Sequence, residues 1–216
     1  MTGAHFWIFS TSLAVATIYF VMIPKRPSVP RSIAKTAPLV FFALIAWAEG
    51  LSPFLTATFA LSAIGDWALS RAGRSAFLYG LSSFALAHVL FVLAFLALSG
   101  VPIWDVFIIS PLPALAMVGV AMSTEIWLAP FTGNLRWPVR GYVGVIALMM
   151  LGAMTLPTSF AAILLGAVLF VLSDIVLSLQ LFRLTDGSWV ALWAGRVVWV
   201  LYIGGQSLIL WGAITP

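Results

Sequence analysis

Residues 60–70, Ala60-Leu-Ser-Ala-Ile-Gly-Asp66-Trp-Ala-Leu-Ser70, form an apolar segment with a carboxylate inside it. The segment is typical of a membrane helix, where an ionisable side chain costs roughly 2.5–3.5 kcal/mol on insertion and is therefore a candidate functional group. A second stretch, Val168-Leu-Phe-Val-Leu-Ser-Asp174-Ile-Val-Leu-Ser178, repeats the pattern 108 residues later, which is half of the 216-residue chain. Asp66 and Asp174 are therefore the first candidates for a functional site.

The composition is that of an integral membrane protein, with 63% hydrophobic and 7% charged residues. A soluble domain carries about 25% charged residues. Ten tryptophans and sixteen phenylalanines suit a lipid-facing surface with anchors at the membrane interfaces. The absence of cysteine excludes disulfides and cysteine-based nucleophiles or metal sites. The net charge of +4 comes from loop residues, so we expect it to report topology, and we expect no nucleic-acid partner.

Apolar segments of about 17–25 residues are long enough to cross a bilayer. They predict an all-α polytopic membrane protein with eight transmembrane helices, forming a single transmembrane domain over residues 1–216. The predicted segments are 5–23, 36–52, 53–70, 76–99, 102–122, 138–155, 158–182 and 189–213. Pro111 and Pro113 should kink the fifth segment.

The basic residues of the connections predict the orientation of the chain. They are Lys25, Arg26, Arg31, Lys35, Arg71, Arg74, Arg136, Arg140 and Arg183, and they all follow the first, third, fifth or seventh segment. The connections on the other face carry no lysine or arginine. The positive-inside rule therefore predicts that the loops after helices 1, 3, 5 and 7 are cytoplasmic and that both termini lie outside.

With this topology the helices that carry Asp66 and Asp174 run in the same direction. We therefore expect two parallel four-helix repeats, 1–108 and 109–216, related by an axis normal to the membrane. The same offset of 108 residues pairs His88 with Arg196. Two pairs of polar residues inside the membrane segments share this offset, which argues against a chance match.

The polar residues of the membrane segments gather in the predicted cytoplasmic half. At a rise of 1.5 Å per residue, both aspartates should lie roughly 8–13 Å inside the basic residues. Six further polar residues belong to this half, namely Lys35, His88, Tyr142, Arg196, Tyr202 and Gln206. We expect a polar cavity between the two halves that opens to the cytoplasm. Two carboxyl groups facing one cavity can divide into an ionised and a protonated member, as acid–base catalysis requires.

Simpler interpretations of these residues stay open. A buried pair of an aspartate with a lysine or arginine can serve only to fix the register of two helices. Serines at positions 62, 70, 173 and 178 more often bond their own helix backbone than act as nucleophiles. A metal site could draw on His88 and the two aspartates only, and we expect no metal or other cofactor.

A transporter or lipid-binding protein is the competing functional class, because parallel repeats with charges near the midplane are also transporter features. It requires access from both faces of the membrane. The predicted outer half offers only Glu49 and Asp105, at helix ends, so an outward path would be dry.

Several short motifs resemble those of the YhhN lysoplasmalogenase family and occur along the chain in the family's order. The motif around the first aspartate is Ser62-Ala-Ile-Gly-Asp66-Trp-Ala-Leu, followed by Gly80-Leu-Ser-Ser-Phe-Ala-Leu-Ala-His88. The others are Ala34-Lys35-Thr-Ala-Pro38, Tyr142 with Met149-Met150, Gly166-Ala-Val-Leu-Phe-Val-Leu-Ser-Asp174, and Tyr202 through Gln206. In the family a proline usually follows the lysine directly, whereas Thr36 and Ala37 intervene here. The resemblance covers about residues 30–213.

The resemblance implies a hydrolase that cleaves the vinyl-ether bond of lysoplasmalogens, giving a fatty aldehyde and glycerophosphoethanolamine or glycerophosphocholine. A bacterial member would lie in the inner membrane and could act on another lysolipid or ether. The expected partners are a lysophospholipid substrate and membrane lipid, with no obligate protein partner. Asp66 and Asp174 would be the general acid and the stabiliser or base, in either order. The expected substrate-binding residues are Lys35 and Arg196 for the headgroup phosphate, and His88, Tyr142, Tyr202 and Gln206 for orienting water or the acid.

Overall fold

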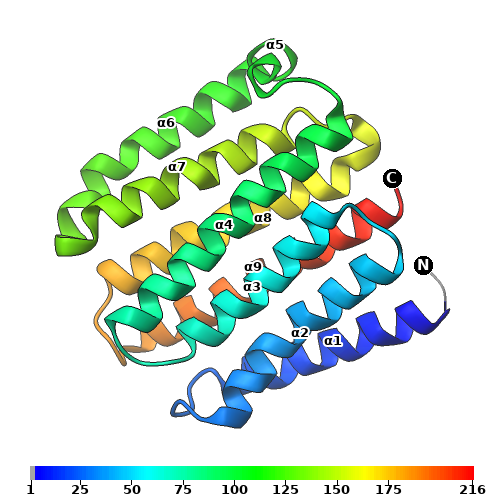
Figure 1. The fold of residues 1–216 in the computed structure, drawn as a ribbon. Helices are drawn as coiled ribbons and strands as arrows, with labels where there is room; N and C mark the ends of the chain where they lie inside the picture. Colours follow the sequence, from blue (N-terminus) through cyan, green and yellow to red (C-terminus); the bar gives the residue numbers. More distant parts are fainter. Residues whose placement is uncertain (1–2) are drawn as a thin grey trace. The chain divides into compact units, whose positions relative to one another are not determined.

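The computed structural model describes residues 3–216, and the regular elements in that range are all helices (Figure 1). The long helices are α1 (Gly3–Met22), α2 (Val29–Ala48), α3 (Pro53–Leu69), α4 (Arg74–Ser99), α6 (Pro111–Trp127), α7 (Arg136–Ala153), α8 (Ala161–Phe182) and α9 (Trp189–Ile214). The short elements are α5 (Val106–Ile109) and the 3₁₀ turns η1 (Ile103–Asp105), η2 (Ala129–Phe131), η3 (Gly133–Leu135) and η4 (Thr158–Phe160). The prediction of an all-α protein is confirmed.

The predicted fifth segment, 102–122, is broken rather than kinked. Ser110 has φ −140° and ψ 61°, outside the helical region, and α6 begins at Pro111. A proline is well accommodated at the first helical position, because the N–H that it lacks would be unbonded there in any case. Pro111 therefore starts a new helix, which continues past the predicted end to Trp127.

Six helices of the described chain are long and apolar enough to cross a membrane: α1, α2, α4, α6, α8 and α9. Helix α3 has only 17 residues. Helix α7 has 18 residues but includes Arg136 and Arg140, which lower its mean hydropathy. The chain is therefore an integral membrane protein in character, and the predicted eight spans are supported for six of the eight long helices.

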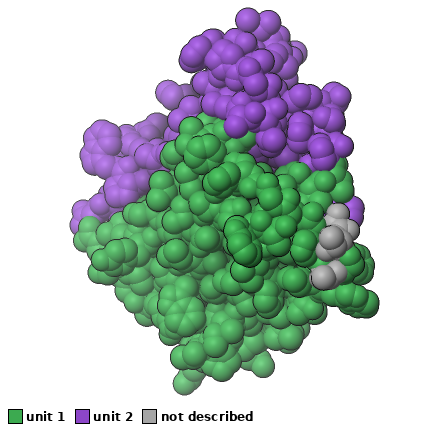
Figure 2. All heavy atoms as spheres, turned by 45° about the vertical axis from the view of Figure 1, so that its right-hand side comes forward, with its two compact units in different colours: residues 1–94, 213–215 green, residues 95–212, 216 purple. Residues whose placement is uncertain are grey.

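The chain forms two compact units, which Figure 2 colours separately. Unit 1 contains residues 1–94 and 213–215, and unit 2 contains residues 95–212 and 216. The two parallel repeats and the loop orientation stay predictions.

The core of unit 1 is a series of aromatic rings that joins its first four helices. Phe9 of α1 stacks on Phe42 of α2, with ring centroids 5.6 Å apart. Phe42 meets Phe59 of α3 edge to face at 5.9 Å, and Phe59 meets Phe91 of α4 in the same way at 6.3 Å. Such ring pairs contribute about 0.5–1.5 kcal/mol each beyond the area that they bury. They hold α2 between α1 and α3, which places the polar residues of α2 and α3 side by side.

The core of unit 2 contains a close crossing of α8 and α9 at glycines. A Cβ atom on Gly205 would lie 2.7 Å from the carbonyl oxygen of Gly166 and 3.1 Å from the backbone nitrogen of Phe170. A Cβ atom on Gly166 would lie 2.6 Å from the carbonyl oxygen of Gly205. Inside a membrane, helices associate through close van der Waals packing, which small residues permit. Gly166 and Gly205 therefore allow the backbones of α8 and α9 to approach closely.

We expect Gly205→Ala to destabilise the protein by about 1–3 kcal/mol, because its methyl group would press on backbone atoms that cannot move aside. The matched control is Gly204→Ala, whose Cβ would lie 3.6 Å from the side chain of Leu169, an ordinary contact. Both variants gain the same helix propensity, so their difference isolates the crossing. Thermal unfolding of the two purified variants in detergent measures it. Equal stability of the two variants would contradict the close approach of α8 and α9.

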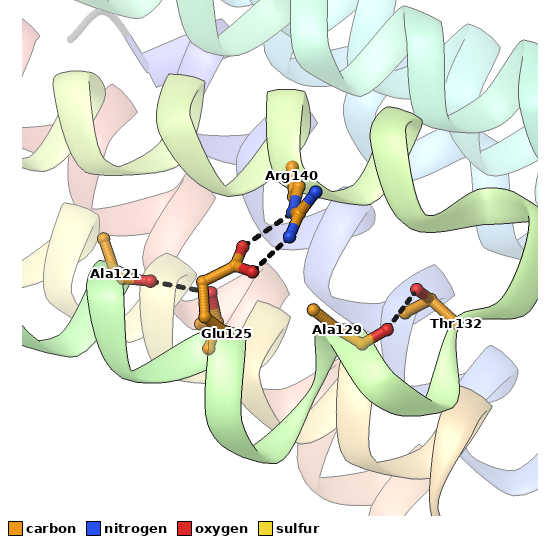
Figure 3. Close-up of polar contacts among 6 residues, drawn as sticks. Ala121, Glu125, Ala129, Thr132 and Arg140 are labelled. Carbon is orange, nitrogen blue, oxygen red and sulfur yellow. Dashed lines mark hydrogen bonds and ion pairs between the residues drawn. The ribbon is translucent and has the colours of Figure 1, made fainter.

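An ion pair that the sequence interpretation missed joins α6 to α7 in unit 2. The Nε and Nη2 groups of Arg140 donate to the two carboxylate oxygens of Glu125, and the Nε bond is 2.8 Å long (Figure 3). Nearby, the hydroxyl of Thr132 donates to the carbonyl of Ala129 at 2.9 Å and closes the turn that follows α6. The paired arrangement of two N–H groups with two oxygens gives this contact a defined geometry.

Candidate active site

Asp66 is the buried carboxylate of unit 1, and it is paired with a lysine. Its Oδ1 atom lies 3.0 Å from Nζ of Lys35 on α2, and the two side chains are 3% and 15% exposed. Asp66 lies in the last turn of α3, where the helix dipole disfavours a negative charge. Burial of a charge is costly as well, and the nearby Nζ atom of Lys35 offers this carboxylate an oppositely charged partner.

Two serines support this ion pair along the contact of α2 with α3. Ser32 lies about one turn before Lys35, and Ser70 one turn after Asp66. Their hydroxyl groups are hydrogen-bonded at 2.8 Å, and both residues are buried. The two helices therefore meet through an ion pair and a hydrogen bond, which together fix their register. Sequence reasoning missed Ser32, although its spacing from Lys35 places it on the same face of α2.

His88 lies on α4, fully buried in unit 1. Its Nδ1 atom is 2.6 Å from the carbonyl oxygen of Phe84, one turn earlier, so this nitrogen carries the proton and donates. The ring also meets Phe91 edge to face, with centroids 6.4 Å apart. These contacts fix the tautomer and the orientation of the imidazole.

Asp174 is the corresponding carboxylate of unit 2, half-buried in α8. The phenol of Tyr142 on α7 donates to its Oδ1 atom over 3.4 Å, a long hydrogen bond. In each unit, therefore, the aspartate has a polar partner on the preceding long helix of the chain. Lys35 and Tyr142 are 107 residues apart, close to the offset of 108 between the aspartates. This similarity favours the predicted repeat.

The remaining predicted residues of unit 2 lie on α9. Tyr202 and Gln206 are one turn apart and buried. The ring of Tyr202 packs edge to face on Phe170 of α8, with centroids 5.3 Å apart. The guanidinium of Arg196 lies 4.8 Å from the ring centre of Trp193. Phe170 precedes Asp174 by one turn, so Tyr202 packs on the same helix that carries the candidate catalytic residue.

The serines next to the aspartates bond their own helices, as expected. The hydroxyls of Ser70, Ser173 and Ser178 donate to the carbonyls of Trp67, Phe170 and Ile175 at 2.6, 2.7 and 2.8 Å. These bonds satisfy polar groups inside an apolar segment. They favour structural roles for the three serines over nucleophilic ones.

Fold and site together define a class of protein: a polytopic α-helical membrane protein with one partnered aspartate in each of two units. The chain belongs to the YhhN family, whose members it matches over residues 30–213. The resemblance deduced from the motifs is thereby confirmed.

Two curated relatives are similar to most of the chain. They are proteins named lysoplasmalogenase from Mycobacterium bovis and Mycobacterium tuberculosis, each 30% identical over 157 residues. The match covers 70% of this chain and 57% of each relative. The chain thus spans little more than half the length of the relatives it matches. No solved structure matches it.

Proposed function

We propose that this protein is a membrane hydrolase that cleaves the vinyl-ether bond of lysoplasmalogens, with Asp66 and Asp174 as its acid–base groups. The observation that carries the proposal is the Lys35–Asp66 pair, a buried carboxylate whose Oδ1 atom lies 3.0 Å from the Nζ atom of a lysine. The family match and the lysoplasmalogenase names of the two relatives support it.

The reaction requires two carboxyl groups in different protonation states. Vinyl ethers hydrolyse by protonation of the β-carbon, which produces an oxocarbenium ion. Water then adds at the α-carbon, and the resulting hemiacetal collapses to an aldehyde and an alcohol. A protonated carboxyl group can supply the first proton, and a carboxylate can stabilise the cation or accept a proton from the attacking water.

The contacts of Asp66 support a division of these roles. Because Lys35 favours its ionised form, we assign Asp66 to the stabilisation of the oxocarbenium ion or the activation of water. Asp174 is then the residue that delivers the proton, and the phenol of Tyr142 orients its carboxyl group. In this proposal Lys35 favours the ionised form of Asp66. This role adds to, or replaces, the contact with the headgroup phosphate that the resemblance implies for Lys35.

The other predicted residues complete the proposed site. Arg196 would bind the headgroup phosphate, since a guanidinium offers a planar set of donors. His88, Tyr202 and Gln206 would orient water or the acid. Tyr202 and Gln206 are buried on one face of α9, which suits residues that hold a water molecule in place.

We further propose that the protein lies in the inner membrane with its basic loops in the cytoplasm. Four arginines at the predicted cytoplasmic face have their guanidinium groups over aromatic rings, at 5.3, 4.3, 4.8 and 3.9 Å from the ring centres. They are Arg31 over Tyr19, Arg71 over Trp67, Arg140 over Trp137 and Arg183 over Phe131. Such pairs suit the headgroup level, where amphipathic side chains anchor a helix.

The test of the proposed function is aldehyde release by the purified protein in detergent. We expect release from 1-alkenyl lysophospholipids with ethanolamine or choline headgroups, and no release of fatty acid from the matching 1-acyl lysophospholipid, which lacks the vinyl ether. A folded protein that releases no aldehyde from either headgroup would contradict the proposal. Retention of lipid by such a protein would instead support the transporter or lipid-binding class.

A further inference from the structure

A groove in unit 2 lies outside the predicted site. It is lined by Trp127 of α6, by Ile175 and Leu179 of α8, and by Arg183, which follows α8. Its volume is about 350 Å³, within the range of roughly 300–1,000 Å³ that is usual for small-ligand sites. Three of the four lining side chains are apolar, and the fourth is a cation.

Arg183 is held in place at one end of this groove. Its Nη1 group donates to the carbonyl of Trp127 at 2.8 Å, and its guanidinium lies 3.9 Å from the ring centre of Phe131. The side chain is nevertheless exposed. A guanidinium has five N–H donors, so the bond to Trp127 leaves donors for a ligand. An oriented, always-charged group of this kind suits a phosphate.

The charges around Arg183 favour an anion. The acidic residue near this end of α6 is Glu125, and Arg140 binds both of its carboxylate oxygens (Figure 3). Arg136 adds another positive charge at the start of α7. With Arg136, Arg140 and Arg183 against Glu125 and Asp186, this end of unit 2 keeps a net positive charge.

The groove extends along α8 from Arg183 toward the position of the candidate catalytic residue Asp174. Ile175 directly follows Asp174 in α8. Arg183 comes nine positions after Asp174, roughly 13 Å along the helix axis. The groove therefore runs from a cation at the predicted membrane surface toward the level of a candidate catalytic residue. A single-chain amphiphile with an anionic headgroup matches this arrangement, because its charged headgroup is followed by an apolar chain.

We propose that this groove binds the lysophospholipid substrate, with its phosphate on Arg183 and its chain along Leu179, Ile175 and Trp127. The proposal rests on the proposed function, because it names the lipid that the hydrolase acts on. It assigns a phosphate contact to a residue outside the predicted set. Arg183 would contact the phosphate together with Arg196, in the place of Lys35, which is paired with Asp66.

The test measures binding separately from turnover. The probe is a 1-O-alkyl lysophosphatidylcholine, whose saturated ether cannot be hydrolysed by the proposed chemistry, titrated into the full-length protein in detergent. We expect Arg183→Gln to weaken its binding about tenfold, as the loss of a charge-assisted contact does. The control is Arg71→Gln, which removes an exposed arginine that also lies over an aromatic ring but in unit 1. It should bind as the wild type does.

A second pair of variants tests the apolar part of the groove without changing its charge. Leu179→Trp fills the groove and should weaken binding by a similar factor. Leu181→Trp changes an exposed leucine on a different face of the same helix and should have no effect. In turnover, Arg183→Gln should raise KM for the alkenyl lysophospholipid about tenfold, with a smaller change in kcat. Its KM for a 1-alkenylglycerol, which has no phosphate, should equal that of the wild type.

Three results would overturn the assignment: wild-type affinity in Arg183→Gln, wild-type affinity in Leu179→Trp, or equally strong competition by a diacyl phospholipid. Competition by inorganic phosphate alone would also overturn it, since the site would then recognise an ion. A wild-type protein that binds the probe but releases no aldehyde would overturn the proposed function and leave the lipid site standing.

Discussion

Lys35→Met is expected to destabilise the protein by about 3–5 kcal/mol, the effect of removing one partner from a buried ion pair. The Asp66 carboxylate would remain 3% exposed at the end of a helix, without the ammonium group that compensates its charge. Thermal unfolding in detergent measures the loss. Stability close to that of the wild type would mean that other groups compensate Asp66, and the role given to Lys35 would be wrong.

The double variant Lys35→Met/Asp66→Leu separates stability from catalysis. Replacing both members of a buried ion pair by apolar residues of similar volume is often neutral or stabilising, so we expect near-wild-type thermal stability. We also expect no aldehyde release, because the carboxylate that stabilises the oxocarbenium ion is gone. A stable and fully active double variant would leave the pair with a purely structural role. This is the alternative in which the ion pair fixes only the register of α2 and α3.

The second large effect is expected at Asp174. Asp174→Asn keeps the size of the side chain and removes the proton that we assign to it, so kcat should fall by about 10²–10⁴-fold, the usual contribution of a general acid. Its thermal stability should change little, since Asp174 is only half-buried. The matched control is Asp186→Asn, at an exposed aspartate in the turn between α8 and α9, which should retain full activity.

Tyr142→Phe should reduce turnover less than Asp174→Asn does. It removes the hydroxyl that donates to Asp174 over 3.4 Å and leaves the ring in place. A long hydrogen bond contributes modestly, so we expect about a tenfold loss of kcat, smaller than that of Asp174→Asn. Single-turnover aldehyde release measures both. Wild-type turnover in Asp174→Asn would remove this residue from the mechanism, whatever Tyr142→Phe shows.

The two aspartates illustrate how similar sequence segments acquire different chemistry. Both lie in apolar helices with small residues on their N-terminal side, and the sequence interpretation could not assign their roles. The partners differ in charge: Lys35 is a cation, whereas Tyr142 is a neutral donor at a longer distance. Electrostatic contacts between helices thus carry the information that separates the proposed stabiliser from the proposed acid.

The positions of the helices and the candidate functional residues could be predicted from the amino-acid sequence. Seven of the eight predicted segments each overlap one long helix, although α2 (Val29–Ala48) begins seven residues before the predicted segment 36–52. The length and apolarity of a membrane-like segment leave the backbone few alternatives to internal hydrogen bonding. The exception at Ser110 has a local cause, since Pro111 suits the first turn of a helix better than its interior. Asp66 and Asp174 stood out for the same physical reason, the cost of an ionisable group in an apolar segment.

Which of these residues contact one another could not be predicted from the sequence and depends on how the helices pack. The pairing of Lys35 with Asp66, of Ser32 with Ser70, and of Glu125 with Arg140 depends on the rotation and register of neighbouring helices. Those are set by packing contacts such as the rings of unit 1 and the Gly166–Gly205 crossing of unit 2. A hydropathy pattern marks a helix as membrane-like, but it does not fix the face that a neighbour covers. The physical reason is that packing between helices inside an apolar medium depends on shape complementarity rather than on apolar character alone.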